Sequence, residues 1–447
     1  MNMESVLRMN PGHEPNSYAR NSTHQRNVMF KAMPIVKERV RALYRKALFP
    51  NHFAVAGLGC ASGSNSLLAI SWIIEAISGL CSQTGRSLPE VLVFLKDLPG
   101  NDFNSVFSSL PSFYENLKEK NRVESNCYVS AMPGSFYGRL FPSRSLHFVH
   151  SSYSVHWLSQ VPELPEQNKG SIYMASTSPS SVFQAYMKQF QKDLTNLLSS
   201  RAEEIIPGGE MVLILIGRSI PDPTSEDCCL LLWWLSRSLV EMADGGLVEA
   251  ADIDSFNLPV YMPYKQEVTD VVEGEGSFTI NRLETFEVNW DPFYHEDEDD
   301  ENCTFDKFKS GQNVADCIRS VTEPILRSHF GDGLVMENVF KRYVRLVGEH
   351  LEVEKTKYVE INFKHMRLYI YIYVCILKNF LTYVDNLEIY IYIYIYVVTS
   401  KSRIFHFCQV RKAEASTKKK DKIRRRKEFL LLGDIYGFCL YVPLVTL

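Results

Sequence analysis

The stretch Phe53–Ser66, FAVAGLGCASGSNS, decides the fold class. Its first half is apolar enough to form a buried strand, and three glycines then lead into the start of a helix. A glycine-rich turn between a strand and a helix lets backbone N–H groups approach a ligand at the helix N-terminus. The pattern suits a dinucleotide, a nucleotide or S-adenosylmethionine, and it lacks the GK[ST] ending of a phosphate-binding loop.

Strand and helix patterns alternate on both sides of this stretch, which is typical of a layered α/β domain. We predict strands at 53–59, 90–97, 127–132, 146–152, 208–218, 277–290 and 355–363, and helices at 65–81, 103–120 and 178–205. Two segments interrupt the alternation, residues 1–30 and the mainly helical residues 225–264. Insertions of this kind usually shape a substrate pocket.

Charge divides the 447-residue chain into two parts. Residues 364–447 hold 15 Lys and Arg against 6 Asp and Glu, whereas the preceding residues hold 33 against 46. The acidic body gives no electrostatic footprint for nucleic acid. We therefore predict a partner other than nucleic acid.

The basic tail differs from the body in its pattern as well. Its runs LYIYIYVC and IYIYIYIYVV are strict two-residue repeats, as expected from translation of a TA-rich microsatellite. We interpret residues 364–447 as a low-complexity tail, either intron read-through or disordered, and residues 1–363 as the folded domain. A membrane anchor is the weaker alternative, because Asp434 and Pro443 interrupt the last apolar run.

Cysteine usage and the N-terminus indicate a reducing compartment. The ten cysteines include no CxxC pair, and the adjacent pair Cys228 and Cys229 would form a strained bridge. The first 22 residues are polar and lack the apolar core of a signal peptide. We predict a cytoplasmic protein with no membrane association.

Seven motifs along residues 1–363 resemble one known family. They are NSYARNSTHQ, LGCASGSNS, DLPGNDFN, PGSFYGRLFP, SSYSVHWLSQVP, DSFNLP and EGSFTINRLE, in this order. Together they resemble the SABATH methyltransferases of plants, which use S-adenosylmethionine to methylate small carboxylic acids or, in one branch, xanthine nitrogens. The resemblance implies a Rossmann-like class I methyltransferase sheet with an α-helical cap over the substrate pocket, and a homodimer.

The resemblance also implies a set of cofactor-binding residues. Asp97, at the end of the second predicted strand, would hold the ribose, a role that suits a carboxylate facing two hydroxyls. From the residues alone, an Asp that caps the next helix is an equally good reading. The full set that the resemblance implies is Tyr18, Ser22, Cys60, Asn65, Asp97, Leu98, Ser135 and Phe136.

Two positions depart from the family's usual sequence. Gly57 stands where the family usually has Asp, which is expected to interact with the cofactor's amino group. Loss of one charge-assisted contact costs about 1.5 to 3 kcal/mol. Lys96 stands where the family usually has Asn, immediately before the ribose acid, and could compete for Asp97. Both changes predict weaker cofactor binding.

The resemblance implies methyl transfer to a carboxylic acid, a reaction that needs no catalytic base. A carboxylic acid is already ionised at neutral pH, so the enzyme has only to align it and exclude water. Gln25 and Trp157 would clamp the carboxylate through an amide and an indole N–H. The implied pocket residues are Gln25, Tyr153, His156, Trp157, Leu231, Leu232, Tyr261, Ile318, Val321 and Tyr358.

Some members of the family are described with a magnesium position. Its counterparts here are Asn168, Asp254, Phe256 and Asn257. One carboxylate with carbonyl oxygens suits a hard cation. Such an ion would be structural, since methyl transfer to a carboxylate does not need a metal.

These observations predict an S-adenosylmethionine-dependent methyltransferase that makes the methyl ester of a small plant acid. Salicylate or benzoate is the first choice and jasmonate the second. A xanthine-type N-methyltransferase and a catalytically impaired small-molecule binder are the alternatives. Gln25 and Trp157 disfavour the first alternative, whereas Gly57 and Lys96 favour the second.

Overall fold

The computed structural model describes residues 3–121, 126–294, 305–331 and 333–368, together with five short strands further along the chain. The chain divides into two compact units, one made of Met1–Ile370 with Thr399–Ser402 and the other of the remaining residues. The late strands are β9 (Ile372–Ile376), β10 (Tyr392–Thr399), β11 (Ser402–Gln409), β12 (Phe429–Leu432) and β13 (Leu440–Pro443). Most of the predicted tail lies outside the described residues, so its interpretation as read-through stays a prediction.

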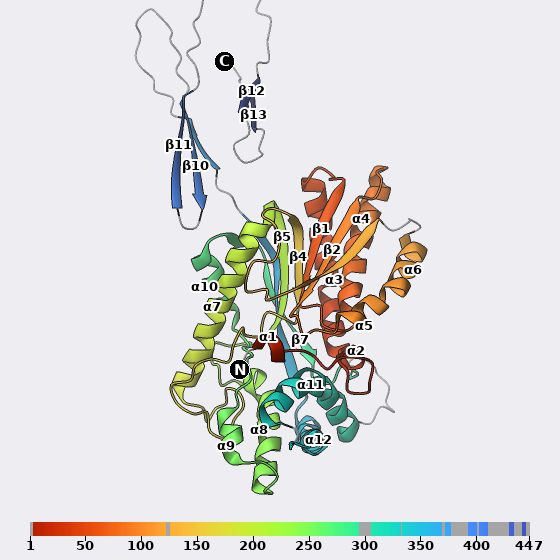
Figure 1. Cartoon of the computed structure of the whole chain (residues 1–447), viewed down its shortest axis with the longest axis vertical. Helices are drawn as coiled ribbons and strands as arrows, with labels where there is room; N and C mark the ends of the chain where they lie inside the picture. The colour runs from red at the N-terminus through yellow and green to blue at the C-terminus, as the bar shows by residue number, and fades with distance from the viewer. Residues whose placement is uncertain are drawn as a thin grey trace, which may run out of the picture. The chain divides into compact units, whose positions relative to one another are not determined.

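An eight-stranded sheet forms the centre of the first unit (Figure 1). Its order is β3-β2-β1-β4-β5-β8-β6, and β7 also pairs with β8. The strands are β1 (His52–Leu58), β2 (Glu90–Asp97), β3 (Cys127–Pro133), β4 (Leu146–Ser152), β5 (Ile205–Gly217), β6 (Phe278–Ile280), β7 (Leu283–Asn289) and β8 (Lys357–Leu368). The first five pair in parallel, and β8 is antiparallel to its neighbours. The predicted α/β class is therefore confirmed.

Both faces of the sheet are buried, as a parallel sheet requires. In β1, Phe53 and Val55 belong to one hydrophobic cluster, whereas Ala54 and Ala56 belong to the other. Helices α3 (Thr23–Lys46) and α4 (Asn65–Thr84) cover one face, and α7 (Ser180–Glu204) with α10 (Lys265–Glu275) covers the other (Figure 1). Helix α4 is long and apolar enough to cross a membrane, but its most apolar window is 67% buried inside the fold. The apolar side chains of α4 therefore pack in the hydrophobic core of the domain.

Two predicted elements are each divided in the structure. The predicted helix 103–120 becomes α5 (Phe103–Ser108) and α6 (Leu110–Asn121). The predicted strand 277–290 becomes β6 and β7, which pair with opposite halves of β8. The one long strand β8 therefore pairs with both β6 and β7.

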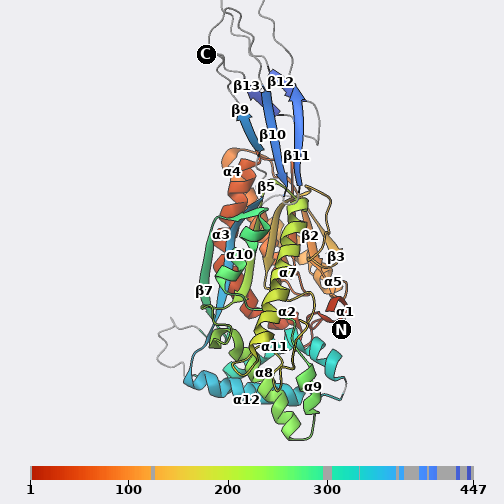
Figure 2. The same ribbon diagram turned by 90° about the vertical axis from the view of Figure 1, so that its left-hand side faces the viewer.

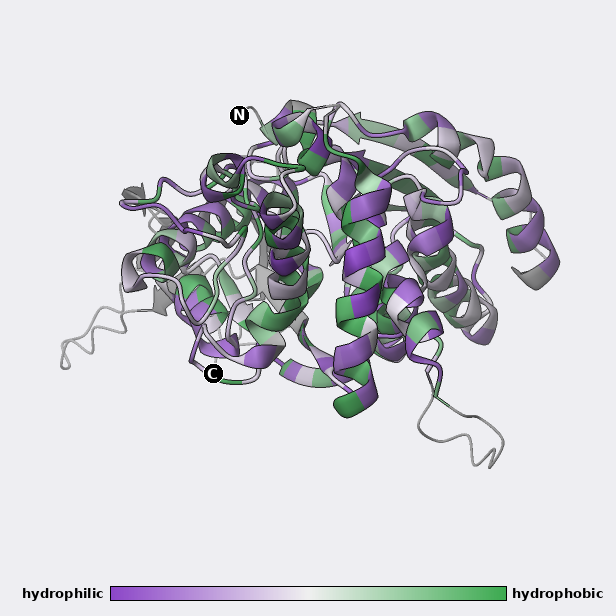
Figure 3. Ribbon diagram, turned by 90° about the horizontal axis from the view of Figure 1, so that it is seen from below, coloured by the Kyte–Doolittle hydropathy of each residue, from purple (hydrophilic) through white to green (hydrophobic). Residues whose placement is uncertain are grey.

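Four helices form the cap at one end of the sheet (Figure 2). They are α8 (Glu226–Asp244), α9 (Ala250–Ser255), α11 (Lys307–Phe330) and α12 (Met336–Val353). Seen from below, the helices carry hydrophobic and hydrophilic bands side by side (Figure 3). Helices α11 and α12 cross closely at Gly311 and Gly348: a Cβ on Gly311 would lie 2.3 Å from the Val344 carbonyl oxygen. Only glycine allows this approach.

The N-terminal segment contains α1 (Met3–Val6) and α2 (Tyr18–Asn21). It forms hydrogen bonds both to the cap and to the loop that follows β2. The Asn10 backbone N–H donates to the Ser320 carbonyl oxygen of α11 over 2.8 Å. The Gly12 N–H donates to Asp102 Oδ2 over 3.0 Å. These anchors fix the position of Tyr18 between the two parts.

Strand β8 continues past Phe363, where the sequence analysis ends the folded domain. Residues 366–368 are the partners of β6, with Met366 opposite Ile280 and Leu368 opposite Phe278. Arg367 also pairs with Glu210 of β5. The division of the chain at residue 363 stays a prediction, but a cut at that point would remove backbone partners of two strands.

We predict that a chain ending at Phe363 is less stable than one ending at Leu368. The shorter chain leaves β6 without its ladder and removes part of the β5 pairing. Its melting temperature should be lower by roughly 3 °C, as a loss of about 2 kcal/mol implies for a domain of this size. Scanning calorimetry of the two truncated proteins measures the difference, and equal melting temperatures would contradict the prediction.

Candidate active site

The loop after β1 is folded tightly against the end of β2. The N–H groups of Gly59 and Cys60 both donate to the Lys96 carbonyl oxygen, over 2.8 and 3.0 Å. Gly59 has φ +75°, and a Cβ there would lie 1.8 Å from Ser154 Oγ. No side chain fits at this position, so Gly59 is required by both conformation and space.

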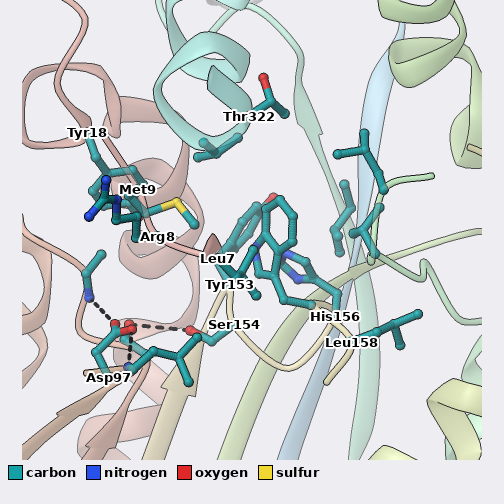
Figure 4. Close-up of a pocket in the computed structure, with 18 of the residues that line it drawn as sticks. Leu7, Arg8, Met9, Tyr18, Asp97, Tyr153, Ser154, His156, Leu158 and Thr322 are labelled. Carbon is teal, nitrogen blue, oxygen red and sulfur yellow. Dashed lines mark hydrogen bonds between the residues drawn. The ribbon is translucent and has the colours of Figure 1, made fainter. Parts of the chain in front are cut away.

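Asp97 is held at the end of β2 by two backbone donors. Ala61 N–H donates to Oδ2 and Leu98 N–H to Oδ1, each over 2.7 Å (Figure 4). Burial raises the pKa of this carboxyl, whereas Lys96 and the two N–H groups act to lower it. Each oxygen keeps a free lone pair, so the carboxylate can still accept hydrogen bonds from hydroxyl groups in the pocket.

The loop that contains Phe136 depends on a buried ion pair at the end of α7. Arg201 Nε lies 2.7 Å from Glu204 Oε2, and both side chains are fully buried. The Arg201 guanidinium also donates to the carbonyl oxygens of Phe136 and Gly138, over 3.0 and 2.9 Å. Glu204 Oε1 accepts from the N–H groups of Leu140 and Phe141. Ser135 and Phe136 thereby reach the pocket wall.

Most of the predicted site residues line one pocket. Its volume is about 1280 Å³ when the open space at its mouth is counted. Figure 4 shows Asp97 on one side of it and Tyr153 with His156 on the other. The predicted residues that line it are Tyr18, Gln25, Asp97, Leu98, Ser135, Phe136, Tyr153, His156, Trp157, Leu231, Leu232, Ile318, Val321 and Tyr358. Residues from the sheet, the N-terminal segment and the cap thus meet at one cavity.

A smaller recess adjoins this pocket and is lined by further residues of the predicted cofactor-binding set. Tyr18, Gln25 and Gly59 border both cavities, and the recess adds Gly57, Cys60 and Asn65. Ser22 stands behind Asn65: Asn65 Nδ2 donates to the backbone oxygen and to Oγ of Ser22, both over 3.0 Å. Ser22 thus positions Asn65 at the recess.

The two predicted carboxylate clamps line the main pocket from different elements. Gln25 lies on α3 and is buried, and among the described residues its Nε2 has only the weak acceptor Cys317 Sγ, at 3.6 Å. Trp157 follows β4, and its carbonyl oxygen accepts from the Tyr137 hydroxyl over 2.5 Å. Within the described part of the chain, no atom accepts from the Trp157 indole N–H. Both donors are therefore available to a ligand.

Comparison with known proteins agrees with this geometry. Residues 4–367 match the family described as SAM dependent carboxyl methyltransferase. The chain belongs to this family. A probable jasmonic acid carboxyl methyltransferase 2 of Theobroma cacao is 44% identical over 81% of this chain and 98% of its own length. A benzoic acid/salicylic acid carboxyl methyltransferase 3 of Petunia hybrida is 45% identical over 81% of this chain and 98% of its own.

A solved structure extends the agreement to the fold. Loganic acid methyltransferase, determined with SAH, is 32% identical, has a TM-score of 0.68, and is matched over 80% of this chain and 98% of its own. The predicted SABATH family, the methyltransferase fold and the methyl donor are confirmed. As a carboxyl methyltransferase, the protein uses S-adenosylmethionine, and the half-buried Asp97 carboxylate beside a glycine cradle fits a nucleoside with ribose hydroxyls.

Three polar residues that the sequence analysis did not connect form a buried network in this methyltransferase. His24 Nε2 lies 2.7 Å from the Tyr153 hydroxyl, which also donates to Glu360 Oε1. Burial raises the pKa of Glu360, while His24 and Tyr153 act to lower it. Tyr153 has φ +61°, which is rare for an aromatic residue. His24 and Tyr153 line the pocket, so the network forms part of its wall.

One signal for this network was present in the sequence. Glu360 is the only charged residue between Tyr358 and Phe363, in a stretch otherwise suited to a buried strand. A buried charge needs a partner, which predicts a polar group nearby. The identity of that partner could not be read from the sequence, because His24 lies 336 positions away.

Tyr261 lies away from the pocket wall on which it was predicted. Its ring packs against Phe190 at 5.0 Å, and its hydroxyl donates to Glu267 over 3.0 Å. Its neighbours Val260 and Met262 line the pocket instead. Adjacent residues of an extended segment point in opposite directions, which accounts for the difference.

Lys96 makes no hydrogen bond or ion pair with Asp97, although its charge acts to lower the pKa of that carboxyl. Its Nζ lies 4.2 Å from the centroid of the Phe136 ring. The oxygens of Asp97 are hydrogen-bonded to Ala61 and Leu98 instead. The cation and the carboxylate therefore occupy separate positions on the pocket wall.

The residues predicted for magnesium are close in the fold but are partly committed to other bonds. Asn168 bonds to the Tyr173 carbonyl through Nδ2 and to the Ser178 hydroxyl through Oδ1. Asp254 Oδ1 accepts from the Gly170 N–H over 2.8 Å. Phe256 packs against Phe330, and Asn257 Oδ1 is buried without a described partner. In the described ranges no three His, Cys, Asp or Glu side chains form a metal-binding group.

We predict that Gly57→Asp strengthens binding of S-adenosylmethionine. Gly57 has no positive φ, and a Cβ there would meet only Leu95 Cδ2, at an ordinary 3.6 Å. A carboxylate at this position would face the recess, where the cofactor's ammonium is its natural partner. Affinity should rise roughly three- to thirtyfold, as a contact of about 1 to 2 kcal/mol implies.

Calorimetry with Gly57→Asn as the control separates charge from shape. Asn has nearly the same size as Asp and lacks its charge. The prediction requires a gain for Gly57→Asp that exceeds the gain for Gly57→Asn. Equal affinities in the two variants would show that Gly57 is not a weak point.

We predict that Tyr153→Phe destabilises the fold by about 2 to 3 kcal/mol. The change keeps the ring but leaves His24 and Glu360 without the hydroxyl that joins them inside the protein. Denaturant unfolding measures the loss. Tyr128→Phe is the matched control, because Tyr128 is 55% exposed and its hydroxyl can bond to water. A loss no larger than that of the control would contradict the prediction.

Proposed function

We propose that this methyltransferase converts a small plant carboxylic acid to its methyl ester, with salicylate or benzoate as the first candidate and jasmonate as the second. The observation that carries the proposal is the pairing of two free donors, Gln25 and Trp157, on the wall of the same pocket that holds Asp97. The names of the relatives support these acids.

The pocket chemistry suits alignment of an anion rather than proton abstraction. When bound, S-adenosylmethionine supplies an electrophilic methyl group on a sulfonium. Gln25 and Trp157 would each donate to one carboxylate oxygen and fix the direction of the attacking lone pair. The acid reaches the site already ionised, so no residue has to remove a proton.

The apolar wall sets the shape that the acceptor must have. Leu231 and Leu232 of α8 and Ile318 of α11 lie on it, facing a pocket that the cap closes. Burial lowers the pKa of His156 to about 3, so this side chain is neutral at physiological pH and adds no charge beside an anionic acceptor. Tyr153 presents an aromatic face, which favours a planar ring, while Leu232 leaves room for a bulkier acid.

A methyl-transfer assay with labelled cofactor tests the proposal directly. Salicylate, benzoate and jasmonate should each be compared with xanthine as a nitrogen acceptor. Methylation of an acid and not of xanthine supports the carboxyl reaction. Methylation of xanthine alone would favour the N-methyltransferase, and no transfer despite cofactor binding would favour an impaired binder.

We predict that Trp157→Phe reduces kcat/KM for the acid by about ten- to a hundredfold. The ring volume is largely kept, while the indole donor to a charged acceptor is lost, and such a bond contributes about 1.5 to 3 kcal/mol. Affinity for S-adenosylhomocysteine should stay within about twofold of the original.

The control for this change is Trp233→Phe, on α8 and outside the residues that line either cavity. It should leave acceptor kinetics unchanged. If Trp157→Phe also left them unchanged, the indole would not contact the acceptor. If both ligands bound more weakly, the change would have disturbed the pocket as a whole.

Three further properties are proposed for this protein: its compartment, a magnesium ion and a dimeric state. The cysteines described in the structure are unbridged and buried, which supports a reducing compartment such as the cytoplasm. A carboxylate oxygen of Asp254 and the free carbonyl oxygen of Asn257 could contact Mg²⁺, which would have a structural role. A homodimer is proposed from the family resemblance alone.

A further inference from the structure

A buried lysine lines the cofactor side of the pocket without a close ionic partner. Lys96 is 1% exposed, yet it contributes to the pocket wall beside Asp97 and Leu98. None of the described residues forms a hydrogen bond or an ion pair with its Nζ. Its nearest defined contact is the Phe136 ring, whose centroid lies 4.2 Å from Nζ.

The surrounding charges do not neutralise this ammonium by direct contact. Asp97 is adjacent in the chain but directs both oxygens to backbone N–H groups. Arg201 adds a second positive charge on the same side and is itself paired with Glu204. Glu4 on α1 and the Cys60 thiol complete the set of titratable groups that influence Lys96.

Burial lowers the pKa of Lys96 to about 8, with Arg201 acting in the same direction and Asp97, Cys60 and Glu4 against it. At neutral pH the side chain is therefore mostly protonated. The pocket consequently presents a positive charge that is shielded from water. In such surroundings a charge acts on a ligand more strongly than it would at the surface.

The two forms of the cofactor respond differently to that charge. S-adenosylmethionine carries a sulfonium, and S-adenosylhomocysteine is the same molecule without the methyl group and without its positive charge. An ammonium in the pocket wall repels the first more than the second. A neutral residue at position 96 would remove this difference and leave the adenosine contacts in place.

We propose that Lys96 biases the cofactor pocket toward the demethylated product, so that S-adenosylhomocysteine binds more tightly relative to S-adenosylmethionine than it would beside an uncharged residue. Lys96 is thus a specificity-determining residue for the charge of the cofactor. The inference rests on the methyl donor and is independent of which acid is methylated.

The test is the ratio of two dissociation constants, measured by calorimetry on the full chain. Lys96→Met and Lys96→Asn remove the charge with side chains of different shape. In both variants the dissociation constant for S-adenosylmethionine divided by that for S-adenosylhomocysteine should fall about three- to thirtyfold, the range expected for one partly shielded charge pair. Because both ligands are measured on the same protein, a partial loss of folded material cancels.

Lys118→Met is the matched control, since it removes one positive charge from an exposed position on α6 that borders neither cavity. Its ratio should equal that of the original protein. An unchanged ratio in both Lys96 variants would overturn the proposal, as would opposite shifts in the Met and Asn variants. Failure of the acceptor assay would leave this binding measurement unaffected.

Discussion

The pocket depends on the buried ion pair between Arg201 and Glu204. A charged pair without solvent contact is maintained only when its remaining hydrogen-bonding groups are satisfied, and here the backbone of the loop from Phe136 to Phe141 satisfies them. Removal of either partner leaves an uncompensated charge in the interior, which costs about 3 to 5 kcal/mol. The loop and the Phe136 ring take their positions from this pair, and Lys96 Nζ lies 4.2 Å from the centroid of that ring.

The strand–glycine–helix stretch was a sound guide to the fold because its constraints are local. The positive φ of Gly59 belongs to the turn itself, and Leu98, the residue after Asp97, supplies one of the two backbone donors to that carboxylate. The alternation of apolar strands and helices likewise predicted the parallel sheet. The antiparallel insertion of β8 between β5 and β6 could not be predicted in this way, because its partners are distant in the chain.

Side-chain direction limited what the sequence could say about the site. Tyr261 and Met262 are both large, buried neighbours, yet only the second faces the pocket. Lys96 sits next to Asp97 but turns toward Phe136. The network of His24, Tyr153 and Glu360 joins three elements that the sequence separates. In each case the sequence did not show in which direction a side chain points or which distant residue it contacts. The residue types alone already indicated the kind of chemistry.

The position of β8 also orders the steps of folding during synthesis. Among the described strands, β6 and β7 pair in the sheet only with β8, and β8 also completes the ladder of β5. Domains fold as units while the chain emerges from the ribosome, N-terminal parts first. Here the sheet cannot close until residue 368 has been made. Strand β5 is complete at Gly217 and presents an unpaired edge from then until residue 368 is made. The nascent enzyme is therefore exposed to aggregation during that part of its translation.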